Sequence, residues 1–200
     1  MKKRKLVCDV GINDADYSVD IRDVWYEHGN RKSRVVWICP FYRKWANMLQ
    51  RCYSQNYQKS RPTYSDCSVC KDWLTFSKFR GWMQTQNWQD KQLDKDILFP
   101  GNRIYSPETC VFVDKEVNLF LIESDAIRGS CLIGVVRHRN KFQASCKDRG
   151  SVKHLGIFDT ELEAHKAWLA FKLERAKELA LRQTDPRVAK ALIDRYENYV

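Results

Sequence analysis

The sequence lacks a long hydrophobic run. No apolar stretch approaches the roughly 18 residues that a helix needs to cross a bilayer. The first ten residues, MKKRKLVCDV, begin with basic side chains but contain no apolar core, so they do not fit a secretory signal peptide. We therefore expect no membrane partner, and we interpret this segment as a flexible basic arm of a cytoplasmic protein.

Paired metal-binding cysteines are also missing. The eight cysteines lie at positions 8, 39, 52, 67, 70, 110, 131 and 146. Only Cys67 and Cys70 have C-x-x-C spacing, and the second C-x-x-C or histidine pair of a structural zinc site is absent. Cys39, Cys52 or Cys110 would have to supply remote ligands. We therefore expect no zinc, and reduced, mostly buried thiols as is usual in the cytosol.

Histidine is scarce, with four residues in the chain. His28 stands beside Gly29, and we interpret it as an exposed loop residue. None of His138, His154 and His165 has the spacing of a nucleophile or of a metal-binding partner. His154 is assigned to the fold or to a phosphate contact.

Basic residues exceed acidic ones by 35 to 25, which gives a net charge of +10 and a pI near 9.2. Such an excess attracts polyanions by steering and by counterion release. The length of 200 residues suits one or two domains of roughly 100–200 residues each.

Two amphipathic helices are predicted in the first half of the chain, at residues 41–53 and 72–84, after a short strand at 34–38. Their apolar stripes recur at three- and four-residue steps, which indicates core packing. The stripes are Phe41, Trp45, Met48, Leu49 and Cys52, and then Trp73, Phe76, Phe79, Trp82 and Met83. The polar segment between the helices is expected to be a loop, with Lys59 and Arg61 at a phosphate backbone.

A strand, a turn, a second strand and a helix are predicted between residues 93 and 118. The first strand carries Leu93, Ile97 and Phe99 and meets the turn Pro100-Gly101-Asn102. The second strand is expected over residues 104–113, and the helix opens at Asp114.

This stretch resembles the nuclease centre of phage-type HNH homing endonucleases. The resemblance implies a ββα-metal fold in which Asp94 and Asn118 are metal ligands and Asn102 takes the turn position. Lys95 stands where the family has the histidine that acts as general base. Tyr105 and the Thr109-Cys110 pair also depart from the family pattern.

The lysine determines what the resemblance implies about catalysis. A general base must be able to accept a proton near pH 7, whereas an ordinary lysine, with a pKa of about 10.4, is protonated there. Asp94 and Asp96 on either side favour the charged form. Burial lowers lysine pKa values, so an active site with Lys95 or Asp96 as base stays open. We expect a scaffold that has lost its usual base and keeps its DNA contacts.

From Gly134 onward the pattern changes to three short strands followed by a long helix. Thr160 and Glu163 form a capping box at the start of that helix, and Ala164, Ala167, Trp168 and Phe171 give it one apolar face. The region resembles an APETALA2-type DNA-binding domain. The matching residues are Gly134-Val135, Phe142, Ala144, His154-Leu155-Gly156, Phe158, Thr160, Glu163-Ala164 and Ala167.

A three-stranded sheet with a helix behind it leaves one face free for the DNA major groove, which admits β-ribbons. Arginine and glutamine read base edges, and lysine more often holds phosphates. The residues expected to contact DNA are Arg137, Arg139, Lys141, Gln143, Lys147, Arg149 and Lys153. Spacing leaves open whether Phe142 faces the core or the DNA.

The predicted fold class is α+β. We expect a basic arm and strand over residues 1–38, a ββα-metal-like HNH domain with packing helices over 39–128, and an APETALA2-type domain over 129–200. A last helix follows Asp185-Pro186, with proline at its first position. This helix either packs back on its domain, which we favour, or forms a homodimer contact.

These observations favour a sequence-specific double-stranded DNA-binding protein that derives from a homing endonuclease. It would act as a transcriptional repressor in a bacterial host cell, without cleavage and without a cofactor. The alternative is an active Mg²⁺-dependent homing or nicking endonuclease. A third hypothesis is a protein-interaction module that presents its basic face to an acidic partner.

Overall fold

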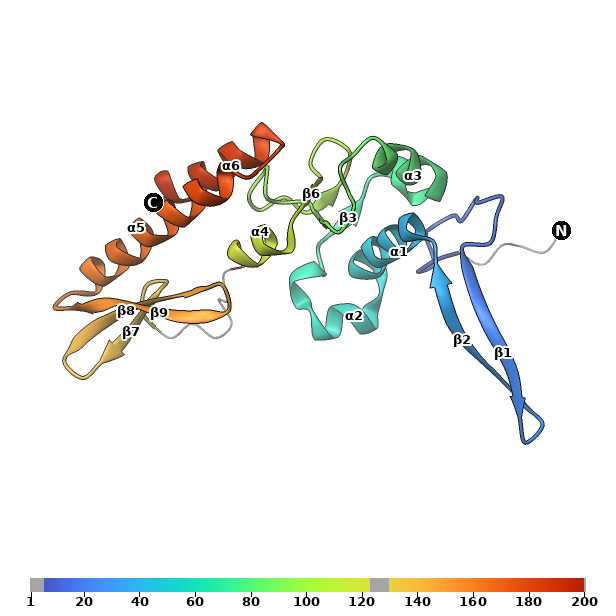
Figure 1. Ribbon diagram of the computed structural model, residues 1–200, viewed down its shortest axis with the longest axis horizontal. Coiled ribbons are helices and arrows are strands. Elements are labelled where there is room, and N and C mark those ends of the chain that lie inside the picture. The colour runs from blue at the N-terminus through green and yellow to red at the C-terminus, as the bar shows by residue number, and fades with distance from the viewer. Residues whose placement is uncertain (1–5, 123–129, 200) are drawn as a thin grey trace. The chain divides into compact units, whose positions relative to one another are not determined.

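The computed structural model describes residues 6–122 and 130–199, in which helices and small sheets are mixed as expected for an α+β protein (Figure 1). The chain forms two units that divide between Phe112 and Val113. The boundary expected at residues 128 and 129 lies outside the described residues, as do residues 1–5 of the basic arm. The elements before the division are β1 (Asp20–Glu27), β2 (Asn30–Ile38), α1 (Pro40–Tyr53), α2 (Gln55–Ser60), η1 (Pro62–Tyr64), β3 (Ser68–Val69), η2 (Lys71–Leu74), α3 (Phe76–Gln84), β4 (Gln92–Asp94), β5 (Ile104–Tyr105) and β6 (Val111–Val113), which spans it.

Aromatic side chains of α1, η2 and α3 form the core of the first unit. Trp45, Trp73 and Phe79 are at most 1% exposed, and Trp45 Nε1 donates to the Trp73 carbonyl over 2.7 Å. The rings of Trp73 and Phe79 meet edge-on with centroids 5.0 Å apart, a geometry that aromatic pairs favour. The aromatic stripes are therefore core residues, as predicted.

The second predicted helix begins later than its sequence pattern indicates. A 3-10 turn, η2, ends at Thr75, whose backbone is extended, and α3 begins at Phe76. The Ile12 N–H donates to the Leu74 carbonyl, and the Ile12 carbonyl accepts from the Phe76 N–H. This pairing with a distant segment uses backbone groups that a continuous helix would need.

The polar segment predicted as a loop contains the short helix α2. The Ser54 side chain caps this helix by accepting a hydrogen bond from the Tyr57 N–H, and Gln58 Nε2 donates to the Cys52 carbonyl over 2.7 Å. Lys59 and Arg61 are exposed at its end.

The strands around Pro100-Gly101-Asn102 are shorter than predicted. β4 ends at Asp94, and β5 pairs in parallel with β3, so that only β6 pairs with β4. The single strand predicted over residues 104–113 is wrong. The Ser106 carbonyl accepts hydrogen bonds from the Thr109 and Cys110 N–H groups, and this turn separates β5 from β6.

The second unit contains a three-stranded antiparallel sheet with α5 along one face (Figure 1). Its elements are α4 (Lys115–Phe120), β7 (Val135–His138), β8 (Lys141–Asp148), β9 (Ser151–Phe158), α5 (Glu161–Ala180) and α6 (Pro186–Glu197). Val135 and Ala144 of the sheet are buried against Ala164 of α5. The predicted sheet and covering helix are thus present.

Both long helices of this unit begin where their caps predict. Thr160 Oγ1 accepts from the Glu163 N–H over 3.2 Å, and Glu163 Oε2 accepts from the Thr160 N–H over 3.1 Å, which completes the capping box. The Asp185 side chain accepts from the Arg187 N–H ahead of α6. Tyr196 of α6 is buried, so this helix packs back on its own unit.

Gly134 and Gly150 provide a stability test, because both have positive φ (80° and 86°) but different surroundings. A Cβ at Gly134 would lie 2.1 Å from the Trp168 ring, whereas a Cβ at Gly150 meets nothing within 4 Å. Gly150→Ala should cost about 1–2 kcal/mol for the left-handed backbone. Gly134→Ala should cost about 1–3 kcal/mol more because the indole must move. Urea unfolding measures both, and equal losses would contradict the packing of Trp168 over Gly134.

Candidate nucleic-acid interface

The face of the β7–β8–β9 sheet that α5 leaves uncovered is polar, basic and partly apolar. Residues directly opposite each other on antiparallel strands point to the same face. Val136, Gln143 and Ile157 lie in one row across the three strands, and Val136 and Ile157 are each about half exposed. The pairs His138–Lys141, Ser145–His154 and Lys147–Val152 extend this row along the sheet.

Five of the seven residues expected to contact DNA lie on this open face or at its ends. Lys141, Gln143 and Lys147 alternate along β8 on the open side. Arg139 and Arg149 occupy the turns before and after β8, with φ of 55° and 47°. These side chains form a strip along the middle strand, and we call it the β8 strip.

The other two residues lie on the side of the helix. Arg137 is opposite Phe142, and Lys153 is opposite Cys146. The Arg137 guanidinium lies 5.5 Å from the Phe142 ring centroid. The Lys153 ammonium lies 5.2 Å from the ring of Phe171 on α5. Both cations are exposed at the sheet edges, but they are not part of the open face.

Phe142 itself faces the core. It is half-buried and packs with Val135, Ala144 and Ala164. This packing decides between the two orientations that spacing left open, because a ring that fills the space under α5 does not lie on the open face.

Two cations of the β8 strip already form ion pairs at the surface. Lys141 Nζ lies 2.7 Å from an Asp159 oxygen, and this hydrogen bond raises the pKa of Lys141. An Arg149 nitrogen lies 3.6 Å from an oxygen of Glu178. Exposed ion pairs contribute little to stability. If phosphate oxygens replaced these carboxylates as partners of Lys141 and Arg149, the protein would therefore lose little stability.

The histidines of this unit divide by exposure. His138 and His154 are exposed on the open face, and the phosphate contact expected of His154 stays a prediction. His165 is buried, stacks on Trp168 with centroids 5.7 Å apart, and its Nδ1 lies 2.8 Å from the Ile133 carbonyl oxygen. It is therefore a core residue.

In the first unit, Lys95 is a buried structural donor. Its side chain is 8% exposed, and its ammonium group donates to Asp96 Oδ2 over 2.9 Å and to the Asn102 carbonyl over 3.0 Å. The ring of Tyr105 lies 5.9 Å from the ammonium group. The Lys95 side chain therefore donates its hydrogen bonds within its own loop.

Asn102 closes the same loop from the other side. Its Nδ2 donates to the Lys95 carbonyl over 2.6 Å and to the Ile104 carbonyl over 2.8 Å. Its Oδ1 accepts from the Ile104 N–H. The turn position is thus fixed by hydrogen bonds that run in both directions between Lys95 and Asn102.

Asp94 caps the bend that follows β4. Its Oδ1 accepts hydrogen bonds from the Asp96 N–H over 2.9 Å and from the Ile97 N–H over 2.8 Å. Burial raises the pKa of Asp94, and the Asp96 carboxylate raises it further. Asp94 thus serves the local fold through its Oδ1.

The second expected ligand, Asn118, lies on α4 and belongs to the other unit, where its N–H donates to the Asp114 carbonyl. Among residues 6–122 and 130–199, no group of three or more His, Cys, Asp or Glu side chains could hold a metal ion. Cys67 is buried and Cys70 is half-buried, both as free thiols. Asp94 and Asn118 therefore stay a predicted ligand pair, and we derive no catalytic step from a metal.

The hairpin β1–β2 forms a further basic and aromatic surface. The sequence analysis predicted only one part of it, the short strand at the end of β2. Arg22, Val24 and Tyr26 alternate along β1 on the same face as Arg31 and Val35 of β2. Tyr26 is 71% exposed. A two-residue turn joins the strands, and both of its residues, His28 and Gly29, have positive φ. Such a turn between two alternating runs is the sequence signal that predicts a hairpin.

Comparisons with protein-family models, curated proteins and solved structures each returned no match. In the part of the chain that the structure describes, none of the helices has the length and apolar character needed to span a membrane.

Asp94 allows a test of capping against metal ligation. Its folded-state pKa is raised, so its contribution to stability is fully present below the unfolded pKa and is lost as pH rises through the folded pKa. Asp94→Asn keeps an oxygen for both N–H groups without the buried charge. It should leave the free energy of unfolding at pH 7 unchanged or raise it by about 1 kcal/mol.

Asp94→Ala is the matched control, because it removes the acceptor and should cost about 1–2 kcal/mol. Urea unfolding of the three proteins at pH 4 and pH 7 distinguishes the cases. If the asparagine variant lost as much stability as the alanine variant at pH 7, the charge itself would be required and the capping role would be wrong.

Proposed function

We propose that this chain is a sequence-specific double-stranded DNA-binding protein that occupies its site without cutting it and so acts as a transcriptional repressor. The observation that carries the proposal is the β8 strip on an uncovered sheet face. This strip combines two long cations, an amide and two turn arginines on a surface that α5 does not use for packing.

The chemistry of this face suits a DNA groove. The major groove is wide enough for a β-ribbon, and a glutamine such as Gln143 can bond both N6 and N7 of adenine. Lys141 and Lys147 on either side suit phosphate oxygens. Val136 and Ile157, exposed in the same row, suit thymine methyl groups, because apolar side chains contact thymine in this way.

The contacts of Lys95 and Asp94 support binding without cleavage. A general base must take a proton from water, but the Lys95 ammonium is engaged with Asp96 and Asn102. Asp94 is engaged with two backbone N–H groups. The proposed origin from an HNH homing endonuclease accounts for a scaffold that is kept while its reactive groups serve the fold.

Two units on one chain strengthen binding through effective concentration. If each unit contacts the same duplex, the second contact becomes intramolecular, and overall affinity can exceed either single affinity by about 10²–10⁴. The first unit offers Lys59 and Arg61 beside α2 and Arg31 on the hairpin, all of them exposed. The second unit offers the β8 strip.

A single experiment separates this proposal from an active endonuclease. Duplexes retained by the full-length protein from a random-sequence pool would be amplified and used in gel-shift and nicking assays, with Mg²⁺ or Mn²⁺ present. We expect a specific shift and intact strands. Turnover cleavage would favour the endonuclease, and affinity that is independent of sequence and vanishes near 150 mM salt would favour the protein-interaction module.

Variants of the β8 strip should have distinguishable effects on the selected duplex. Lys147→Gln should weaken binding similarly on all sequences and reduce the slope of log K against log salt by about 1. Gln143→Ala should relax the preference at one base pair by about 1–3 kcal/mol. Lys166→Gln, an exposed charge change on α5, is the control for net charge.

Gel shifts at several salt concentrations, on the selected duplex and on single-base variants of it, measure these effects. If Lys147→Gln and Lys166→Gln changed the affinity equally, net charge alone would account for binding, and the open face would not be the contact surface.

A further inference from the structure

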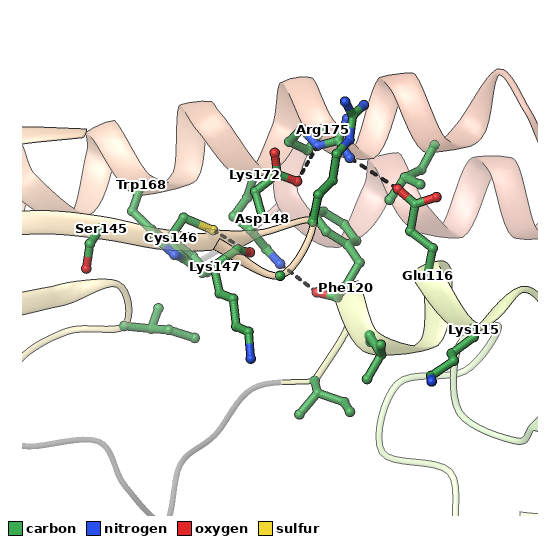
Figure 2. A pocket seen from close by; sticks show the side chains of 16 residues that line it. Lys115, Glu116, Phe120, Ser145, Cys146, Lys147, Asp148, Trp168, Lys172 and Arg175 are labelled. Atoms are coloured by element: carbon green, nitrogen blue, oxygen red, sulfur yellow. Dashed lines mark hydrogen bonds and ion pairs between the residues drawn. The ribbon is translucent and has the colours of Figure 1, made fainter. Parts of the chain in front are cut away.

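The second unit contains a cavity of about 670 Å³ between α4, the end of β8 and α5 (Figure 2). Pockets for small molecules typically have volumes of about 300–1,000 Å³ and mostly apolar walls with a few fixed polar groups. Nothing in the proposed DNA contact uses this cavity as a whole, so its chemistry can be considered by itself.

Much of the cavity wall is apolar. Leu119 and Phe120 come from α4, Ile133 precedes β7, and Trp168 and Leu179 come from α5. Trp168 presents an aromatic surface, and Leu119 is 56% exposed although it is a large apolar side chain. A bound apolar group would remove this surface from water, which is favourable.

The charged groups in the wall are mainly cations. The five basic residues are Lys115, Lys147, Arg149, Lys172 and Arg175, and the two acidic residues are Glu116 and Asp148. Both acidic side chains pair with Arg175, over 3.3 Å and 2.9 Å (Figure 2). The field in the cavity is therefore positive, which attracts an anion.

Two of these cations are held rigidly. Lys172 is 5% exposed, its ammonium group donates to the Phe120 carbonyl over 2.6 Å, and it lies 3.6 Å from the Phe120 ring centroid. Arg175 is 6% exposed and is fixed by its carboxylate partners. Figure 2 shows Lys172 directed from α5 toward Phe120 and Lys147 extending from β8. The charges of Lys172 and Arg175 are therefore a fixed part of the wall, whereas Lys147 is exposed.

We propose that this cavity binds a small organic anion with an apolar, ring-sized body and a carboxylate, sulfonate or phosphate group. The body lies against Trp168 and Leu119, and the anionic group lies toward Lys147. An inorganic anion would leave the apolar wall hydrated, and a neutral ring would leave the positive field without a partner. The wall fits a ligand that has both parts.

Binding would also affect the DNA contact, and this consequence rests on the proposed function. Lys147 and Arg149 belong both to the cavity wall and to the β8 strip. An anion held beside Lys147 competes with phosphate for the same charge, so the ligand would weaken binding to the selected duplex.

The test uses the full-length protein without DNA and a matched pair of fluorescent probes, anilinonaphthalene sulfonate and its neutral parent, phenylnaphthylamine. We expect the sulfonate to bind with one site per chain and about tenfold more tightly than the neutral probe, because the two differ by one charge. Lys147→Gln should weaken the binding of the sulfonate alone, by about fivefold. Leu119→Trp, which fills the cavity, should weaken both probes.

Lys166→Gln is again the control and should leave the affinity for both probes unchanged. Exposed apolar residues elsewhere can also bind such dyes, and the variants identify which site is responsible. Equal affinity for both probes would overturn the anionic part of the proposal. Binding that is unaffected by Leu119→Trp, or no binding of either probe, would overturn the site.

A competition experiment with the selected duplex then separates the two proposals. Release of bound duplex by the sulfonate, but not by the neutral probe, supports the coupling. If the protein bound no duplex, the proposed function would fail while the probe results stood. If it bound duplex and the sulfonate released none, the coupling alone would be wrong.

Discussion

The ion pair and hydrogen bonds of the Lys95 ammonium group constrain the middle of the chain. By joining Asp96 to the Asn102 carbonyl, the ammonium closes the bend that follows β4, and Asn102 returns the contact through its own amide. A buried charge is tolerated only when it is paired and hydrogen-bonded. Loss of the lysine would therefore leave the Asn102 carbonyl without this donor, whereas the half-exposed Asp96 carboxylate would face water. Lys95 is therefore committed to holding this loop.

In the second unit, by contrast, α5 packs on one face of the sheet and leaves the other face uncovered. Trp168 lies over Gly134, where no side chain could fit, and Phe142 fills the space beneath α5 on the same side. Among the described residues, the buried cluster of the sheet is thus on the face toward α5. The described residues of the β8 strip take no part in that cluster, and Lys141 and Arg149 form ion pairs at the surface.

Local signals account for what could be predicted. α1, α5 and α6 follow from helical periodicity and from caps such as Thr160 and Asp185, each confined to a few neighbouring residues. Long-range contacts account for most of the rest. The pairing of β5 with β3 and the contact of Ile12 beside Thr75 join segments whose sequences carry no mark of each other.

Strand register explains the partly wrong assignment of the open face. Gly156 is opposite buried Ala144 and therefore lies on the side of the helix. If side chains alternated without interruption from Gly156, Lys153 would point to the open face. A register shift in β9 between Gly156 and His154 reverses this and sets Lys153 opposite buried Cys146, because one extra residue exchanges the two faces of a strand. The position of Arg137 could have been predicted without the register. Arg137 is two residues from buried Val135 on the same strand, so both side chains point to the side of the helix. Alternation is therefore reliable only where the strand itself carries no extra residue. Along β8, which pairs with β7 over residues 141–144 and with β9 along its length, alternation correctly places Lys141, Gln143 and Lys147 on one face.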